Sequence, residues 1–429
     1  LKSIISKKLR KKIKSIKLGD ILFIYYYKLK INYIRKRISQ YDELNVVFIL
    51  MDLSMWKYEG LYQIMANHPR FNPVILIAPR INQNEEGMKL DSLKMITHFK
   101  KKKYKIIEGY DFENKCWYDL KENIKPNIIF YTQPYNTAID KKYSIKNFKN
   151  HLICYIPYAF LINFYKWGYD SLLHNISWKL FYPTNIHLET AKSLAKNKGV
   201  NVFVTGYPIA DEILDENRNV LDPWENKNKK IKRIIWAPHH SISKEEGSLN
   251  LSNFLNNHQT MFDIAEKYKY QIHIAFKPHP ILLSNLYNHS SWGKEKADAY
   301  YNKWEEISNG QLETGEYIDL MLESDAMIHD SGSFMAEYLY TKKPVFYLAK
   351  NNRIENLCSF GKLAFDQHYK GYTGEEIEQF IVEVVLGNND LRLEARKIFF
   401  NKFLLPPNDH LVAENVFNEI LVGLKWNNG

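Results

Sequence analysis

The chain has 429 residues, enough for about two or three domains, and its 45% hydrophobic and 14% aromatic content excludes a disordered or low-complexity protein. The three cysteines, Cys116, Cys154 and Cys358, lack metal-ligand spacing and exclude a disulfide framework, which fits a reducing cytosol. We also expect no secretory signal, because no small-residue cleavage site follows a compact apolar region, and no run is apolar enough to span a bilayer.

The net charge of +11 is concentrated in residues 1–40. This segment has 13 Lys and Arg against one acid, a charge of +12, which leaves −1 for the rest of the chain. Apolar residues recur among the lysines at helical spacing, at Ile5, Leu9, Ile13 and Ile16. The pattern favours a basic amphipathic helix on an anionic membrane surface, against a helix that only covers the protein body. Because the body has no basic excess, we expect no nucleic-acid binding.

Short apolar runs alternate with helix-length segments through the first half of the chain. Such runs predict parallel strands that are buried on both faces of a sheet. The expected strands cover residues 45–52, 73–78, 104–108, 128–131 and 152–156, and the expected helices cover 56–67 and 88–101.

A second series of the same kind follows a polar segment, residues 211–231, whose composition suits a linker. Its expected strands are 233–238, 271–276, 327–329 and 344–348, its helices are 251–268 and 295–307, and a last helix covers 408–426. We therefore predict an α/β protein with two Rossmann-like domains whose parallel sheets face an interdomain cleft. The predicted parts are the basic arm 1–40, the domains 41–208 and 209–405, and the helical segment 406–429, which packs back toward the first domain.

The most informative stretch is residues 327–339, where an apolar run ends in a polar turn that opens a helix. The turn supplies Ser331, Gly332 and Ser333. Free N–H groups and the helix dipole make such a point an anion site, and a glycine allows close approach of the backbone. We interpret the turn as the binding site for the phosphates of an activated donor, against simple N-capping of the helix. His329 and Asp330 precede the turn, and Asp330 could orient the loop or a ligand hydroxyl.

Two further polar clusters follow strands of the same series. His239 and His240 follow one strand, and Lys277 and His279 follow another. Since the carboxyl ends of parallel strands meet at one sheet edge, these clusters should converge with the turn. Lys277 and His279 could neutralise a diphosphate, and His279 could protonate a leaving phosphate, against a purely structural turn. Adjacent histidines on extended chain point to opposite faces, so we expect one of them in the cleft, or a polar loop, and no metal site.

Single residues complete the candidate site. Glu337 lies one helical turn past Ser333 and either contacts a ribose or base, or is an ordinary exposed carboxylate. Asp52 closes the first strand and either acts as a general base or caps the next helix. Tyr158 follows another strand and would line the acceptor side of the cleft.

These motifs resemble those of the CDP-glycerol glycerophosphotransferases, the teichoic-acid primases and polymerases with relatives in capsule synthesis. The resemblance spans roughly residues 125–350 and rests on residues 205–208, 236–238, 277–280, 329–334 and 343–346. It implies the GT-B architecture and a location in the cytoplasm, on the inner face of the bacterial membrane. It also implies that Ser331 and Ser333 bind the donor pyrophosphate and that His279 is functional.

The chain departs from this family in the first domain. The family carries a Trp-His-Gly whose histidine is the base, whereas residues 154–159 read Cys-Tyr-Ile-Pro-Tyr-Ala. The possible substitutes are His151, Tyr158 and Asp52.

The resemblance implies a transferase of bacterial surface polysaccharide synthesis, capsular or teichoic-acid-like. It would move glycerol phosphate, or a related polyol phosphate, from a CDP-activated donor to a hydroxyl of a lipid-linked or oligosaccharide acceptor, with release of CMP. The nucleotide diphosphate is then a substrate, and no cofactor is expected. The alternatives are a GT-B glycosyltransferase that uses a nucleotide sugar and a catalytically impaired GT-B-like scaffold.

Overall fold

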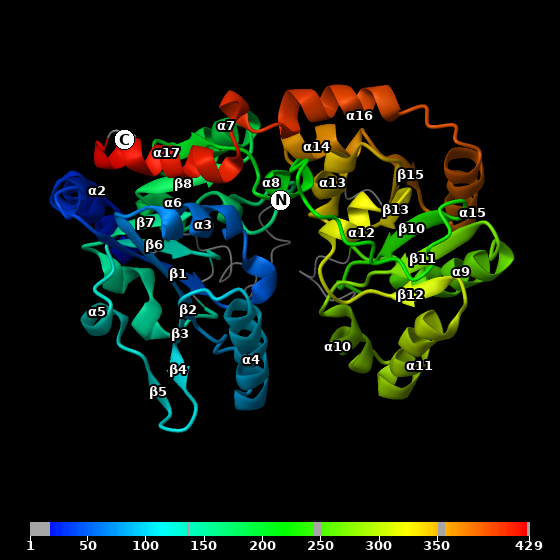
Figure 1. Cartoon of the computed structure of the whole chain (residues 1–429), viewed down its shortest axis with the longest axis horizontal. Helices are drawn as coiled ribbons and strands as arrows, with labels where there is room; N and C mark the ends of the chain where they lie inside the picture. Colours follow the sequence, from blue (N-terminus) through cyan, green and yellow to red (C-terminus); the bar gives the residue numbers. More distant parts are fainter. Residues whose placement is uncertain (1–17, 135–136, 243–250, 351–356, 427–429) are drawn as a thin grey trace, which may run out of the picture. The chain divides into compact units, whose positions relative to one another are not determined.

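The computed structural model describes residues 18–134, 137–242, 251–350 and 357–426. These residues form two compact units (Figure 1). The first unit comprises the described residues up to Leu161, Tyr165–Asp211 and those from Pro406 onward, and the second comprises Ile162–Phe164 and Glu212–Leu405. The helical pattern predicted at Ile5–Ile16 lies outside the described residues.

The first unit is built on a seven-stranded parallel sheet with the order β3-β2-β1-β6-β7-β8-β9. Its strands are β1 (Leu44–Leu50), β2 (Phe71–Ile77), β3 (Ile106–Glu108), β6 (Ile128–Tyr131), β7 (Leu152–Tyr155), β8 (Lys179–Tyr182) and β9 (Val202–Val204). The five strands predicted in the first half are confirmed, whereas the short strands β8 and β9 were not predicted. The side chains of β6, β7 and β8 are all buried, as expected for a sheet covered on both faces.

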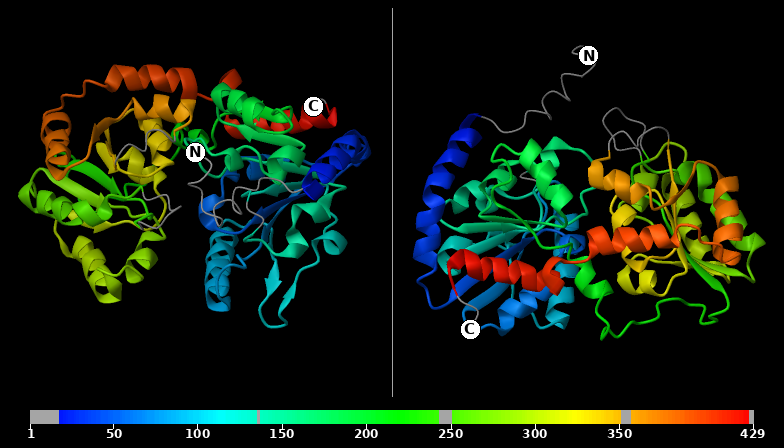
Figure 2. Two further views of the ribbon diagram at one scale, coloured as in Figure 1. Left: turned by 180° about the vertical axis from the view of Figure 1, so that it is seen from behind. Right: turned by 90° about the horizontal axis from the view of Figure 1, so that it is seen from above.

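Helices cover both faces of this sheet (Figures 1 and 2). They are α2 (Leu18–Ile38), α3 (Glu59–Asn67), α4 (Glu85–Lys101), α5 (Leu120–Asn123), α6 (Leu172–Ile176), α7 (Asn185–Leu194), α8 (Ile209–Ile213) and α17 (Val412–Leu424). The C-terminal helix α17 packs against α3 and α2, although it follows the second unit in the chain. A short hairpin of β4 (Tyr110–Asp111) and β5 (Cys116–Trp117) extends from the unit.

Helix α2 has an apolar inner face and a partly apolar outer face. On the inner face, Tyr27 and Ile34 are buried, and the Tyr27 hydroxyl donates to the carbonyl oxygen of His151 at 2.8 Å. This helix, which follows the predicted stripe in the chain, therefore covers the body. Its outer face exposes Leu29 to 85% and Tyr33 to 68%, so burial against the sheet does not account for all of its apolar residues.

The second unit contains a six-stranded parallel sheet with the order β12-β11-β10-β13-β14-β15. The strands are β10 (Lys232–Ala237), β11 (Ile272–Phe276), β12 (Gly310–Leu312), β13 (Ala326–His329), β14 (Val345–Leu348) and β15 (Tyr369–Gly371). Four of them were predicted, whereas β12 and β15 have three residues each and no apolar run. Trp236 pairs with Phe276, and Ala237 pairs with His329, so the loops that follow β10, β11 and β13 leave the same edge side by side.

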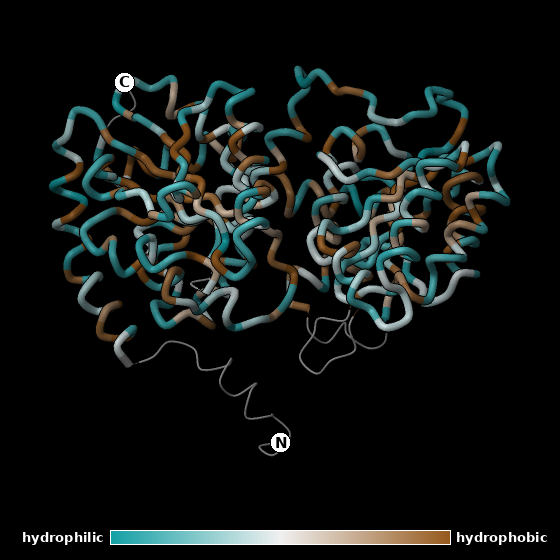
Figure 3. The backbone as a smooth tube through the Cα atoms, turned by 90° about the horizontal axis from the view of Figure 1, so that it is seen from below, coloured by the Kyte–Doolittle hydropathy of each residue, from teal (hydrophilic) through white to brown (hydrophobic). Residues whose placement is uncertain are grey.

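The helices of this unit surround a strongly aromatic core. They are α9 (Phe254–Lys267), α10 (Leu282–Tyr287), α11 (Gly293–Glu306), α12 (Ile318–Leu322), α13 (Phe334–Glu337), α14 (Ser359–Phe365), α15 (Gly374–Gln379) and α16 (Leu393–Phe399), with π-helical turns at Phe380–Leu386 and Phe400–Leu404. Trp236 lies between Phe254, Phe276 and Trp304, with ring centroids 4.9 to 5.8 Å away. Hydrophobic residues gather in the central strands of each unit, and the outer helices are largely hydrophilic (Figure 3).

The polar segment 211–231 is not a free linker, which corrects the prediction. Trp224 is fully buried, and its indole N–H donates to the carbonyl oxygen of Leu320 at 3.4 Å. Asp222 accepts a hydrogen bond from the buried guanidinium of Arg233 at 3.0 Å. The segment is polar because it lies on the surface of the second unit, and its one tryptophan packs into that unit.

The predicted α/β fold with two Rossmann-like parallel sheets is confirmed. The predicted cleft between the two domains stays a prediction. No helix among the described residues is both long and apolar enough to cross a bilayer.

Candidate active site

Three histidines meet at the carboxyl ends of β10 and β11. The ring centroids of His239 and His240 are 4.2 Å apart, and His279 lies 4.3 Å from His240 and 5.3 Å from His239. The prediction that the adjacent histidines point to opposite faces is wrong, because β10 ends at Ala237 and the chain bends at His240. The backbone N–H of His279 donates to the carbonyl oxygen of Pro238 at 3.1 Å, which joins the two loops.

Burial favours the uncharged form of these rings. It lowers the pKa of His239 to about 2 and that of His279 to about 3, and the neighbouring rings add to both effects. The backbone N–H of Ser241 lies 3.2 Å from Nδ1 of His239, and that of Ile281 lies 3.2 Å from Nδ1 of His279. If both Nδ1 atoms accept these hydrogen bonds, Nε2 carries the proton of each neutral ring and can donate to a ligand.

Lys277 follows β11, two positions before His279 in the chain. Its side chain is buried, and its ammonium group donates to the carbonyl oxygen of Gly315 at 2.8 Å. Burial lowers its pKa, and the carboxylates of Glu313 and Glu316 act in the opposite direction. The charge of Lys277 also contributes to the lowered pKa of His279, so the two groups are electrostatically coupled.

Asp330 fixes the loops around the site. Its carboxylate accepts hydrogen bonds from the backbone N–H of His239 at 2.5 Å and of Asn253 at 2.6 Å. Asp330 is 2% exposed, and this burial raises its pKa to about 7 against the opposing effect of the two hydrogen bonds. Of the two roles considered, the loop-orienting role has direct structural support.

The turn Ser331–Ser333 leads into a short helix. Helix α13 has four residues and continues as a 3-10 helix over Tyr338–Thr341. The Ser333 side chain stands at the N-cap position, yet within the described structure it makes no capping hydrogen bond. Simple capping therefore does not explain this serine.

His329 and Glu337 are both buried. The His329 ring packs against Tyr347 and His368 at 5.3 Å each, and burial lowers its pKa to about 3. Its Nε2 has no hydrogen-bond partner among the described residues. Glu337 is 2% exposed and accepts a hydrogen bond from the Tyr317 hydroxyl at 2.8 Å, so the interpretation as an exposed carboxylate is wrong.

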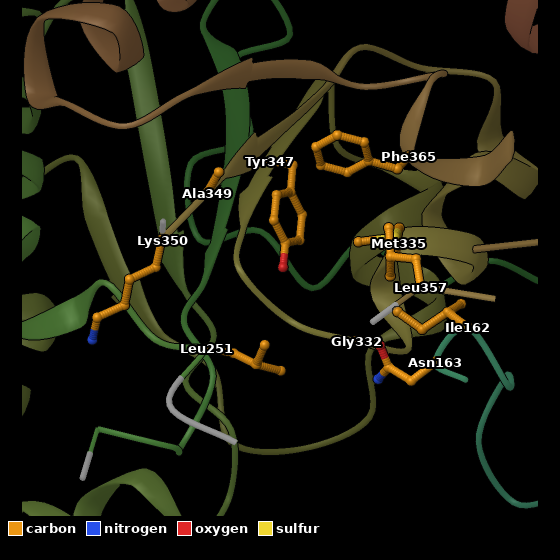
Figure 4. Close-up of a pocket in the computed structure, with 10 residues that line it drawn as sticks. All are labelled: Ile162, Asn163, Leu251, Gly332, Met335, Tyr347, Ala349, Lys350, Leu357 and Phe365. Carbon is orange, nitrogen blue, oxygen red and sulfur yellow. The ribbon is translucent and has the colours of Figure 1, made fainter. Parts of the chain in front are cut away.

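A pocket adjoins the turn (Figure 4). Gly332 and Met335 line one side, and the Tyr347 hydroxyl points into the pocket. Lys350 and Phe365 also belong to its lining, together with Ile162, Asn163, Leu251, Ala349 and Leu357. The sequence did not predict this pocket. Ala349 and Lys350 nevertheless follow β14 directly, in the same way that the predicted site motifs follow β10, β11 and β13.

In the first unit, the three candidate bases occupy different positions. Asp52 follows β1 and caps a 3-10 helix, accepting from the N–H of Ser54 at 3.0 Å and pairing with Arg80 at 3.1 Å. Tyr158 follows β7, and its carbonyl oxygen accepts from the Tyr207 hydroxyl at 3.1 Å. His151 precedes β7, so it lies at the amino end of the sheet, opposite the edge at which the other two lie.

Comparison with known proteins agrees with the motifs. The family described as CDP-Glycerol:Poly(glycerophosphate) glycerophosphotransferase matches residues 171–354, which confirms the predicted resemblance over that segment. No curated protein matches the chain. The matched segment contains all the residues that the sequence predicted to bind the donor.

Solved structures share the fold of the whole chain. The UDP complex of S. aureus MnaA has 16% identity and a TM-score of 0.58, covering 90% of this chain and 98% of that chain. The UDP-GlcNAc 2-epimerase from Neisseria meningitidis bound to UDP-GlcNAc has 16% identity and a TM-score of 0.53, with coverages of 89% and 99%. A variant of the wall teichoic acid polymerase TagF has 12% identity and a TM-score of 0.53, with coverages of 96% and 99%. At these identities, the similarity concerns the fold, which is GT-B-like.

Proposed function

We propose that this protein is a transferase of bacterial surface polymer synthesis that moves glycerol phosphate from CDP-glycerol to an acceptor hydroxyl. The proposal is carried by a set of hydrogen-bond-donating and cationic side chains at the edge of the second sheet. These side chains lie inside the segment that the family matches. Histidines, Lys277 and the Ser331–Ser333 turn follow three strands that are neighbours in the sheet, β11, β10 and β13. Such hydrogen-bond-donating side chains suit a diphosphate better than an uncharged ligand.

The reaction that we propose is an in-line displacement at phosphorus. The acceptor oxygen forms a bond to the β-phosphorus of CDP-glycerol, and the bond from that phosphorus to the bridging oxygen breaks. CMP leaves with the bonding electron pair, and a base takes the acceptor proton. Lys277 and His279 would stabilise the charge that develops on the phosphate oxygens, and the serine hydroxyls would hold the pyrophosphate.

Asp52 and Tyr158 are the candidates that we retain for the base. Both follow strands at the carboxyl edge, where ligands of parallel sheets bind. His151 lies at the amino end of β7, and this position argues against it. Asp52 already caps a helix and pairs with Arg80, so as a base it would act from a fixed position.

Calorimetric titration with CDP-glycerol, CMP, UDP and UDP-sugars tests the donor. We expect CDP-glycerol to bind and, with an acceptor from crude membranes, to release CMP. Binding of uridine nucleotides alone would favour the glycosyltransferase, which needs the same phosphate site but attacks a sugar carbon. Binding without turnover of any donor would favour the impaired scaffold.

We further propose that the protein acts on the inner face of the cytoplasmic membrane, beside a lipid-linked acceptor. On α2, residues Leu22, Tyr25, Leu29 and Tyr33 recur at helical spacing and are at least 65% exposed. Apolar and tyrosine side chains among basic residues suit the interface of an anionic membrane. We expect the double variant Leu29→Glu and Tyr33→Glu to lose flotation with anionic liposomes. Leu391→Glu, which alters an exposed leucine of the second unit, is the matched control, and equal flotation of both variants would refute the proposal.

A further inference from the structure

We propose that His239, His240 and His279 bind one divalent transition-metal ion, with zinc as the expected metal. This inference goes beyond the proposed function, whose chemistry uses no metal, and rests on the geometry of the three side chains. It corrects the expectation from sequence that this histidine pair chelates poorly.

The three rings are close enough to share an ion. One ring nitrogen of each histidine lies within 4.8 Å of the corresponding atoms of the other two. In a tetrahedral zinc site with Zn–N bonds of about 2.0–2.1 Å, ligand nitrogens stand about 3.3 Å apart. Closing the cluster on zinc would shorten the nitrogen–nitrogen separations from at most 4.8 Å to about this value.

The ligands lie in the loops that follow two paired strands. His239 and His240 follow β10, and His279 follows β11, its direct neighbour in the sheet. The loops are joined by the hydrogen bond from the His279 N–H to Pro238. The carbonyl oxygen of His240 also accepts from the Asn285 side chain at 2.9 Å. Metal sites on fixed strand ends need little reorganisation to bind their ion.

A second shell is present for His239. Its Nδ1 lies 2.8 Å from the Ser241 hydroxyl, which can accept the Nδ1 proton when Nε2 binds a metal. The backbone N–H of Leu251 donates to the same hydroxyl at 2.8 Å and fixes its position. Metal-binding histidines characteristically have such a partner on the other ring nitrogen.

The ligand chemistry selects the metal. Three imidazoles suit zinc, copper or nickel, whereas magnesium and calcium prefer oxygen ligands. Three protein ligands also leave one tetrahedral position open to an oxygen ligand, as in catalytic zinc sites. The other protonation pattern, with Nδ1 accepting from the backbone and Nε2–H donating, would favour an oxyanion over a metal, and the experiment separates the two.

The test is a cobalt(II) titration of the tag-free, chelator-treated full chain, with no nucleotide present. We expect one equivalent to bind with the visible absorption of a tetrahedral nitrogen site, and zinc to displace it. His240→Ala and His279→Ala should each weaken binding at least about tenfold. His410→Ala, which removes an exposed histidine of the first unit, should leave it unchanged.

X-ray absorption of the zinc-loaded wild-type protein keeps the test independent of whether the variants fold. We expect three imidazole ligands at about 2.0–2.1 Å. Absence of stoichiometric binding by the wild-type chain, or binding that both site variants retain, would overturn the proposal. Because no donor is present, this result is independent of whether CDP-glycerol is the substrate.

Discussion

Replacing both serines of the turn, by Ser331→Ala with Ser333→Ala, tests the phosphate site most directly. Within the described structure the Ser333 side chain makes no capping hydrogen bond, so its removal forfeits none of the usual capping energy. The free energy of unfolding should then change by no more than about 0.5 kcal/mol, as for other partly exposed positions. For a unit of this size, this corresponds to a melting-temperature shift within about 2 °C.

The effect on ligand binding should be much larger. A hydrogen bond from a hydroxyl to a charged phosphate contributes about 1.5–3 kcal/mol, which is about tenfold to a hundredfold in affinity. The two serines are neighbours, so their effects need not add. We expect the double variant to bind CDP-glycerol at least about a hundredfold more weakly, measured by calorimetric titration alongside thermal unfolding.

Ser324→Ala is the matched control, because we expect it to lower stability without changing the affinity for CDP-glycerol. Ser324 is 4% exposed, and its hydroxyl donates to the carbonyl oxygen of Met321 at 2.8 Å and contacts the Tyr338 hydroxyl at 2.8 Å. Its loss should cost about 1–3 kcal/mol of stability and leave donor affinity unchanged. A large loss of stability in the Ser331 and Ser333 variant, with intact binding, would show that the turn only caps the helix and would refute this reasoning.

Three further predictions concern other residues. Burial raises the pKa of Asp330 in the folded state from the ordinary 3.8 to about 7. Protonated Asp330 therefore contributes fully to stability below about pH 4, and this contribution is lost as the pH rises through 7. Asp330→Asn should thus flatten the fall in melting temperature between pH 4 and 7, and parallel curves would contradict this. If Asp52 is the base, Asp52→Asn should lower kcat at least about a hundredfold and Tyr158→Phe should not, whereas the reverse pattern would identify Tyr158. Trp224→Ala should destabilise the second unit by about 3–5 kcal/mol, and unchanged urea unfolding would show that the segment is a free linker after all.

Much of the fold could be predicted from sequence, because buried parallel strands consist of uninterrupted apolar runs. Ile128–Tyr131 and Val345–Leu348 are such runs, and both form strands. The same pattern predicted that the polar loops after β10, β11 and β13 share one edge of the sheet, and the pairing of these strands agrees with it. Strands without an apolar run, such as Gly310–Leu312, carry no such signal and were missed.

The sequence by itself determined which residue types stand at the edge of the second sheet: histidines, Lys277, and the serines of one turn. Only the tertiary structure decided what each one faces. His239 and His240 come together because β10 ends at Ala237 and the chain bends at His240, and periodicity along the chain does not report that change. Glu337 is buried against Tyr317, twenty positions earlier in the sequence. Local patterns fix the direction of a side chain only while the backbone is regular, and these groups lie where regular structure ends or pack against distant parts of the chain.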